Sequence, residues 1–224
     1  MNITVMASAA FKEAYLELVP GFERASGHTV GNLWVPSVQM MARLKGGERV
    51  DLVILSAAAL DELIQAGIIA ERFDLARSGV GVAVRAGAPK PDISSGDAVK
   101  RAVLAAKGIA YSTGPSGVYL AGLFHRMGIA DQIKHKVRQV QGEPAGAVAA
   151  RGDAEIAFQQ VSELLPVPGI ELVGPLPPDI QQITVFSAGL HVRSPSPDAA
   201  RALVEFLTAP AAATVIRCKG MEPA

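Results

Sequence analysis

The sequence has no excess charge of either sign, since 21 Lys and Arg residues balance 21 Asp and Glu residues over 224 positions. Proteins that bind nucleic acids usually carry a basic excess or stripe, because they neutralise phosphates. The balance therefore excludes nucleic acid as the expected partner. Hydrophobic residues make up 50% of the chain and charged residues only 19%, which argues against disorder. The length suits one large domain or two small ones.

Cysteine is nearly absent, because Cys218 is the only one in the chain. A disulfide framework and a cysteine metal cluster are thereby excluded. The four histidines are scattered and lack the spacing of metal ligands. We expect neither a cofactor nor a bound metal.

Long hydrophobic runs are also missing, and none approaches the roughly 18 apolar residues of a membrane span. The protein is therefore not expected to be embedded in a membrane. The segment Met1–Met6 lacks the basic and long apolar regions of a signal peptide. We expect a cytoplasmic protein if Met1 is the native start, and a periplasmic one if a leader has been removed.

The familiar catalytic and nucleotide motifs do not occur. The chain has no phosphate loop with Gly-Lys-Ser/Thr and no dinucleotide fingerprint. The Gly-x-Ser-x-Gly pattern of a nucleophile elbow is missing too. No residue stands out as a catalytic base, so the sequence assigns no catalytic residue.

What the chain does contain is an alternation of short apolar runs and helical patterns. The apolar run Leu52–Leu55 is typical of a parallel strand buried on both faces. This order predicts an α/β fold with a mostly parallel sheet. The predicted strands are 3–6, 29–35, 51–55, 80–85, 108–111, 155–158, 170–173 and 182–192. The main predicted helices are 11–22, 37–44, 58–65, 99–106, 118–127, 145–151, 198–207 and 211–219.

Three of the predicted strand-to-helix junctions carry small hydroxyl residues. Ligands in open parallel sheets lie beyond the carboxyl ends of the strands, and the helix N-termini there favour anions. A single serine at such a place is more often an ordinary helix N-cap, yet three junctions together favour an anion site. The candidate ligand-binding residues at these junctions are Ser8, Ala9, Ser37, Val38, Gln39, Thr113, Ser116, Gly117 and Val118.

Four segments resemble the molybdate-type family of substrate-binding proteins, which have the type II periplasmic-binding-protein fold. They are ITVMASAAF (3–11), VDLVILS (50–56), GPSGVY (114–119) and DAEIAF (153–158). The resemblance implies two lobes with a small anionic ligand in the cleft between them, and an ABC-transporter permease as a candidate partner. Lobe 1 would comprise 1–81 plus 188–224 and lobe 2 would comprise 82–187, with hinges near 81–84 and 185–187.

Departures from the family pattern bear on the ligand. Molybdate-binding members place a serine where Ala10 stands, and a tyrosine where Phe158 stands. Their second junction is a run of serines, where this chain has Ser37-Val38-Gln39. Each missing donor to a buried oxyanion costs about 1–3 kcal/mol. The long amides of Gln39 and Gln159 suit a larger ligand, so Gln159 joins the candidate ligand-binding residues.

Several functions remain open at this point. The first is a binding protein for a small anion, with a small organic acid favoured over molybdate. The second is an isomerase for a small tricarboxylic acid, because aconitate isomerases resemble the same family. That reaction needs a base, for which Glu155 is a weak candidate. The others are a molybdate or tungstate binding protein of an ABC transporter and a cytoplasmic ligand sensor.

Overall fold

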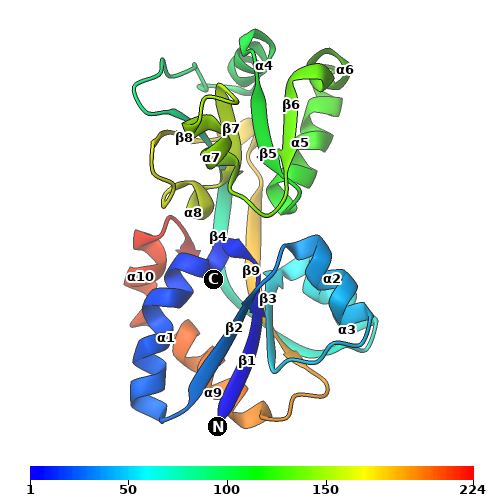
Figure 1. The fold of residues 1–224 in the computed structure, drawn as a ribbon, viewed down its shortest axis with the longest axis vertical. Helices are drawn as coiled ribbons and strands as arrows, with labels where there is room; N and C mark the ends of the chain where they lie inside the picture. The colour runs from blue at the N-terminus through cyan, green and yellow to red at the C-terminus, as the bar shows by residue number, and fades with distance from the viewer. The chain divides into compact units, whose positions relative to one another are not determined.

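The computed structural model describes all of residues 1–224, and the chain divides into two compact units. Unit 1 comprises Met1–Ser78 and Thr184–Ala224, and unit 2 comprises Gly79–Ile183. Unit 1 thus contains both ends of the chain, drawn blue and red in Figure 1, and unit 2 contains the middle. The strands β4 (Ile69–Arg85) and β9 (Ile183–His191) carry the chain from one unit to the other.

The sheet of unit 1 is built on three parallel strands followed by helices. β1 (Asn2–Ala7) lies between β2 (Thr29–Trp34) and β3 (Leu52–Ser56), and β9 pairs antiparallel with β3. β10 (Glu222–Pro223) pairs with the unit 1 part of β4. The helices of unit 1 are η1 (Ala9–Phe11), α1 (Lys12–Ser26), α2 (Ser37–Lys45), α3 (Ala57–Gln65), α9 (Pro197–Thr208) and α10 (Ala212–Cys218).

Both faces of this sheet are buried, which explains the unbroken apolar run of β3. Leu52 and Ile54 belong to the apolar cluster that also contains side chains of α1, α9 and α10. Val53 and Leu55 belong to a second cluster with side chains of α2 and α3. Because successive strand residues point to opposite faces, a strand covered on both sides must be apolar throughout.

The sheet of unit 2 repeats this plan. β5 (Ile109–Ser112) lies between β6 (Val137–Val140) and β7 (Ile156–Gln160), all parallel, and β4 pairs antiparallel with both β7 and β8 (Ile170–Pro175). One apolar cluster covers each face. The helices are α4 (Gly96–Ala105), α5 (Pro115–Arg126), α6 (Ala130–Ile133), η2 (Lys134–Lys136), α7 (Ala145–Ala150), α8 (Val161–Leu164) and η3 (Pro178–Ile180).

The alternation of strands and helices predicted from the sequence is present, with one marked difference in length. β4 begins at Ile69, whereas the sequence pattern predicted a strand only over 80–85. The extra residues include Glu71, Arg72 and Asp74, whose charges hid the strand. No single helix is long and apolar enough to cross a membrane. Only α9 and α10 taken together reach that length and hydropathy, and the two helices are bent by 66° relative to each other.

Candidate functional site

The three parallel strands of each unit end at the same edge of their sheet, and a helix begins after each of them. In unit 1 these helices are η1 with α1, then α2 and α3. In unit 2 they are α5 after β5, α7 after β6 and α8 after β7. Both units therefore gather helix N-termini at one edge, which is where α/β sheets bind ligands.

Ser8 is the buried polar residue at this edge of unit 1. Its backbone N–H donates to the carbonyl oxygen of Ile54 at 3.0 Å, which ties the end of β1 to β3. The side chain is 5% exposed, and its Oγ has no hydrogen-bond partner. The side chain makes no capping bond to the following helix, so Ser8 does not act as an ordinary N-cap. A buried hydroxyl without a partner in the protein is costly and calls for an explanation, such as a hydrogen bond to water or to a ligand.

The other candidates of unit 1 lie closer to water. Ala9 and Gln39 are exposed, and Ser37 is half-buried at the first position of α2. Val38, in the first turn of α2, leaves 58% of its surface exposed. These residues flank the N-termini of α1 and α2, where backbone N–H groups are free of partners within the helix.

Ser116 occupies the corresponding place in unit 2. It lies in the first turn of α5, is 1% exposed, and its Oγ has no partner. The next residue must be glycine, because a Cβ at Gly117 would lie 1.6 Å from the carbonyl oxygen of Ser112. Thr113 fixes the same turn through its backbone N–H, which donates to Val140 at 3.1 Å. Val118 is 68% exposed.

Gln159 is the last residue but one of β7 and lies near this turn, since Tyr111 of β5 pairs with Phe158 of β7. The Gln159 side chain is 3% exposed and both of its amide atoms are bonded within unit 2. Its Oε1 accepts from the N–H of Ala145 at 2.7 Å, and its Nε2 donates to Glu163 Oε1 at 2.8 Å. Gln159 therefore holds its neighbours in place, in addition to any contact with a ligand.

Phe158 points the opposite way, into the apolar core of unit 2. It is 1% exposed and packs edge-on against Phe124, with ring centroids 6.1 Å apart. Phe158 is thus a core side chain, and it has no hydroxyl to offer a ligand.

Glu163, in α8, is a titratable residue that the sequence reasoning missed. Burial raises the pKa of Glu163 to about 7, and the hydrogen bond from Gln159 opposes that rise. No neighbouring charge contributes to the shift. The signal available in the sequence was an acid three residues beyond a buried strand and four residues after Gln159. Burial of a carboxyl group, however, depends on tertiary packing.

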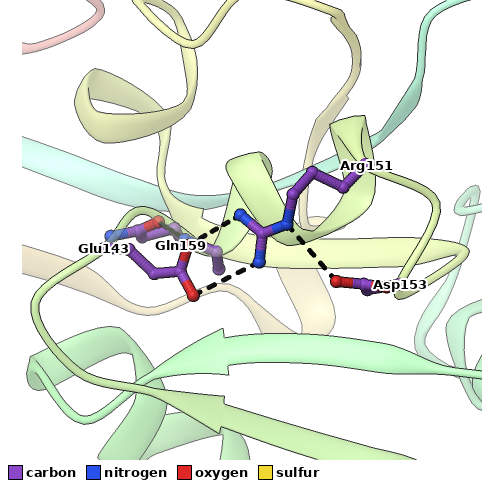
Figure 2. Close-up of polar contacts among 5 residues, drawn as sticks. Glu143, Arg151, Asp153 and Gln159 are labelled. Atoms are coloured by element: carbon purple, nitrogen blue, oxygen red, sulfur yellow. Dashed lines mark hydrogen bonds and ion pairs between the residues drawn. The ribbon is translucent and has the colours of Figure 1, made fainter.

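Three charged residues that flank α7 are paired with one another. Arg151 contacts Glu143 at 2.8 Å and Asp153 at 3.3 Å, and Figure 2 shows its guanidinium directed at these two carboxylates. All three side chains are about half exposed to solvent, so these ion pairs add little stability. Their charges are satisfied locally, whereas Glu163, which is partly buried and bonded to the buried Gln159, makes no ion pair.

Glu155, the weak candidate for a catalytic base, lies at the other end of β7. It directly precedes the strand, is exposed, and accepts from the N–H of Lys107 at 2.8 Å. Its carboxylate therefore fastens a loop at the amino end of the strand. No group of three or more His, Cys, Asp or Glu residues in residues 1–224 could hold a metal ion.

The two-unit topology, with parallel strands that feed helices at one edge, defines a type II periplasmic-binding-protein fold. The family model described as bacterial extracellular solute-binding protein matches residues 3–222. The chain belongs to this family. The molybdate-type family resemblance and the fold predicted from the four sequence segments are thereby confirmed.

Three known proteins illustrate the similarity. An aconitate isomerase from Pseudomonas sp is 40% identical over 230 residues, covering 99% of this chain and 88% of the relative. The periplasmic molybdate-binding protein of Azotobacter vinelandii matches with a TM-score of 0.81 at 18% identity, covering 98% of both chains. The sulfate-binding protein SubI from Mycobacterium tuberculosis matches at 0.76 and 19% identity, covering 100% of this chain and 87% of its own. These two structures support the fold alone.

Proposed function

We propose that this protein binds a small tricarboxylate of the aconitate class and isomerises it. The observation that carries the proposal is the pair of buried serine hydroxyls, Ser8 and Ser116, which have no partner in the protein. Each lies at the edge of its own unit's sheet where helices begin, in the setting that favours an anionic ligand. Carboxylate oxygens of a ligand would accept from these hydroxyls and remove the cost of leaving them unpaired.

The choice of a carboxylic acid rests on two further points. Phe158 offers no hydroxyl to an oxyanion such as molybdate, which disfavours that ligand. The relative named aconitate isomerase is 40% identical over 99% of this chain, which supports both the tricarboxylate and its turnover. The extracellular description of the family supports a periplasmic location, which cell fractionation tests.

The direct test is incubation of the protein with trans-aconitate, with cis-aconitate measured by chromatography. We expect conversion in both directions towards the same equilibrium ratio. A parallel thermal-shift series with aconitate, molybdate, tungstate and sulfate tests the ligand class, because a ligand that binds only the folded protein raises Tm. A shift with molybdate alone, without conversion of aconitate, would contradict the proposal.

A second candidate function is binding without turnover. It is favoured by the names of the structural neighbours, which are binding proteins for molybdate and sulfate. In that case an ABC-transporter permease would be the partner. A rise in Tm with trans-aconitate but no cis-aconitate formed would select this candidate.

A further inference from the structure

The reaction proposed above needs a group that moves a proton between carbon atoms. In aconitate a methylene carbon and a vinylic carbon flank the central carbon. Breaking one C–H bond at the methylene carbon leaves an electron pair that is delocalised over the three carbons and their carboxylates. A new C–H bond then forms at the former vinylic carbon. The double bond shifts by one carbon, the product is again aconitate, and no oxidant or reductant is needed.

We infer that Glu163 is the residue that takes this proton from the methylene carbon and returns it to the former vinylic carbon. The inference rests on the proposed function. It is carried by the position of the Glu163 carboxyl group in α8, directly after β7 and at the same sheet edge as Ser116.

Geometry singles out Glu163 among the acidic residues. Its Oε1 is held by Gln159 at 2.8 Å, and Gln159 is itself fixed by the N–H of Ala145 at 2.7 Å. The carboxyl group makes no ion pair, so no cation competes for its negative charge. By contrast, Glu143 and Asp153 of the same region are paired with Arg151, and Glu155 accepts a backbone N–H at the opposite end of β7.

The electrostatic setting suits the same task. A general base works best when its pKa lies near the pH of operation. Burial raises the pKa of Glu163 to about 7, the amide of Gln159 opposes the rise, and no titratable group of neighbouring elements contributes. At neutral pH the carboxylate can accept a proton and the acid can return it.

The test compares Glu163→Gln with the matched control Glu155→Gln, a substitution of the same residue type at the other end of the same strand. For Glu163→Gln we expect kcat for aconitate isomerisation to fall by about 100-fold or more, while trans-aconitate still raises Tm. Glu155→Gln should keep kcat within about twofold of the unmodified protein, because its carboxylate lies away from this sheet edge. Glu163→Asp should retain a measurable part of the activity, since it keeps the carboxylate.

The outcomes separate the two proposals. If the unmodified protein isomerises aconitate and Glu163→Gln keeps activity within tenfold, the role of Glu163 is overturned and the proposed function stands. If the unmodified protein binds trans-aconitate without converting it, both are overturned. Should Glu163→Gln fail to fold, the pH profile of the unmodified protein decides. A kcat that falls about tenfold per unit below pH 7 supports Glu163, and a flat profile from pH 5 to 8 overturns it.

Discussion

The backbone of Gly117 lies so close to Ser112 that a methyl group at position 117 would sit 1.6 Å from the Ser112 carbonyl oxygen. This approach lets α5 begin directly after β5 and places Ser116 at the sheet edge. Gly117→Ala should therefore force the first turn of α5 away from β5. We expect a loss of stability of about 3 kcal/mol or more and weaker ligand binding, measured by urea unfolding and by the thermal shift with trans-aconitate.

A second glycine of the same helix provides the control. A Cβ at Gly122 would meet only the far end of the Arg126 side chain, at 3.3 Å. Gly122→Ala should raise stability by up to about 1 kcal/mol, because alanine favours the helix interior. Equal effects of the two substitutions would show that the close approach to Ser112 is unimportant.

The buried hydroxyls of Ser8 and Ser116 predict effects of opposite sign on stability and on binding. Removing an unpartnered buried hydroxyl costs the fold no hydrogen bond, so Ser8→Ala and Ser116→Ala should leave Tm of the free protein unchanged or raise it. Each should weaken binding of the tricarboxylate by about 1–3 kcal/mol, which calorimetry would measure. Ser26→Ala, which removes a hydroxyl bonded to the Phe22 carbonyl at 2.8 Å, should leave binding unchanged.

Asp51 is a buried carboxylate that holds three separate segments of unit 1 together. It is 1% exposed and accepts from Thr4 N at 2.8 Å, Ser194 Oγ at 2.6 Å and Ser196 N at 3.0 Å. Asp51→Ala leaves these buried donors unpaired. We expect a loss of about 2–5 kcal/mol in the free energy of unfolding, measured in urea.

Asp61 provides the comparison for that measurement. Its carboxylate is 52% exposed and contacts Arg72 at 2.6 Å. An exposed ion pair contributes little, so Asp61→Ala should change stability by less than about 1 kcal/mol. A similar loss for both variants would refute the structural role of Asp51.

The raised pKa of Glu163 makes stability depend on pH in a defined direction. The folded protein holds this proton up to about pH 7, whereas an unfolded glutamate releases it near its ordinary pKa of about 4.3. Between these values the unfolded state binds fewer protons, so stability falls as pH rises. Glu163→Gln cannot titrate, so its stability relative to the unmodified protein should rise by about 2 kcal/mol from pH 5 to pH 8.

That comparison is made by urea unfolding of both proteins at the two pH values. The expected change in stability is smaller than the whole pKa shift would give, because the Glu163 side chain is partly exposed and solvent screens its charge. A constant difference between the two proteins across this range would show that Glu163 titrates as an ordinary carboxylate.

The hydrogen bond from Gln159 lowers the pKa of Glu163 against the effect of burial. Gln159→Met removes the donor and keeps a side chain of similar length. We expect the acidic limb of the kcat profile to move to higher pH, which a merely structural role of Gln159 would not produce. The measurement is the pH profile of aconitate isomerisation, and an unmoved limb would argue against this positioning role.

The parallel strands and their polar junctions could be predicted from the sequence because they depend on local patterns. The run Leu52–Leu55 predicted a strand covered on both faces, and the clusters on the two sides of β3 show why. Ser8 and Ser116 could be singled out by their place after strands β1 and β5.

Other features depend on contacts between distant segments and left no local signal. Glu163 is an ordinary first-turn acid in the sequence, and its raised pKa arises from the atoms packed around it. The absence of a cap bond at Ser8 left no local signal either, since its backbone is extended as in an ordinary N-cap. The first half of β4 was missed because its alternating charges hide a strand whose partners include β10, at the far end of the chain.

The pairing of β3 with β9 has a consequence for synthesis of the chain. Leu52 pairs with Leu190, and all residues of unit 2 lie between them in the sequence. On the ribosome, β4 to β8 are therefore complete before β9 emerges, and unit 1 stays open at the edge of β3 until then. Unit 2, the middle of the chain, can therefore fold first. Unit 1, whose N-terminal strands are synthesised first, can be completed only after β9 has been synthesised.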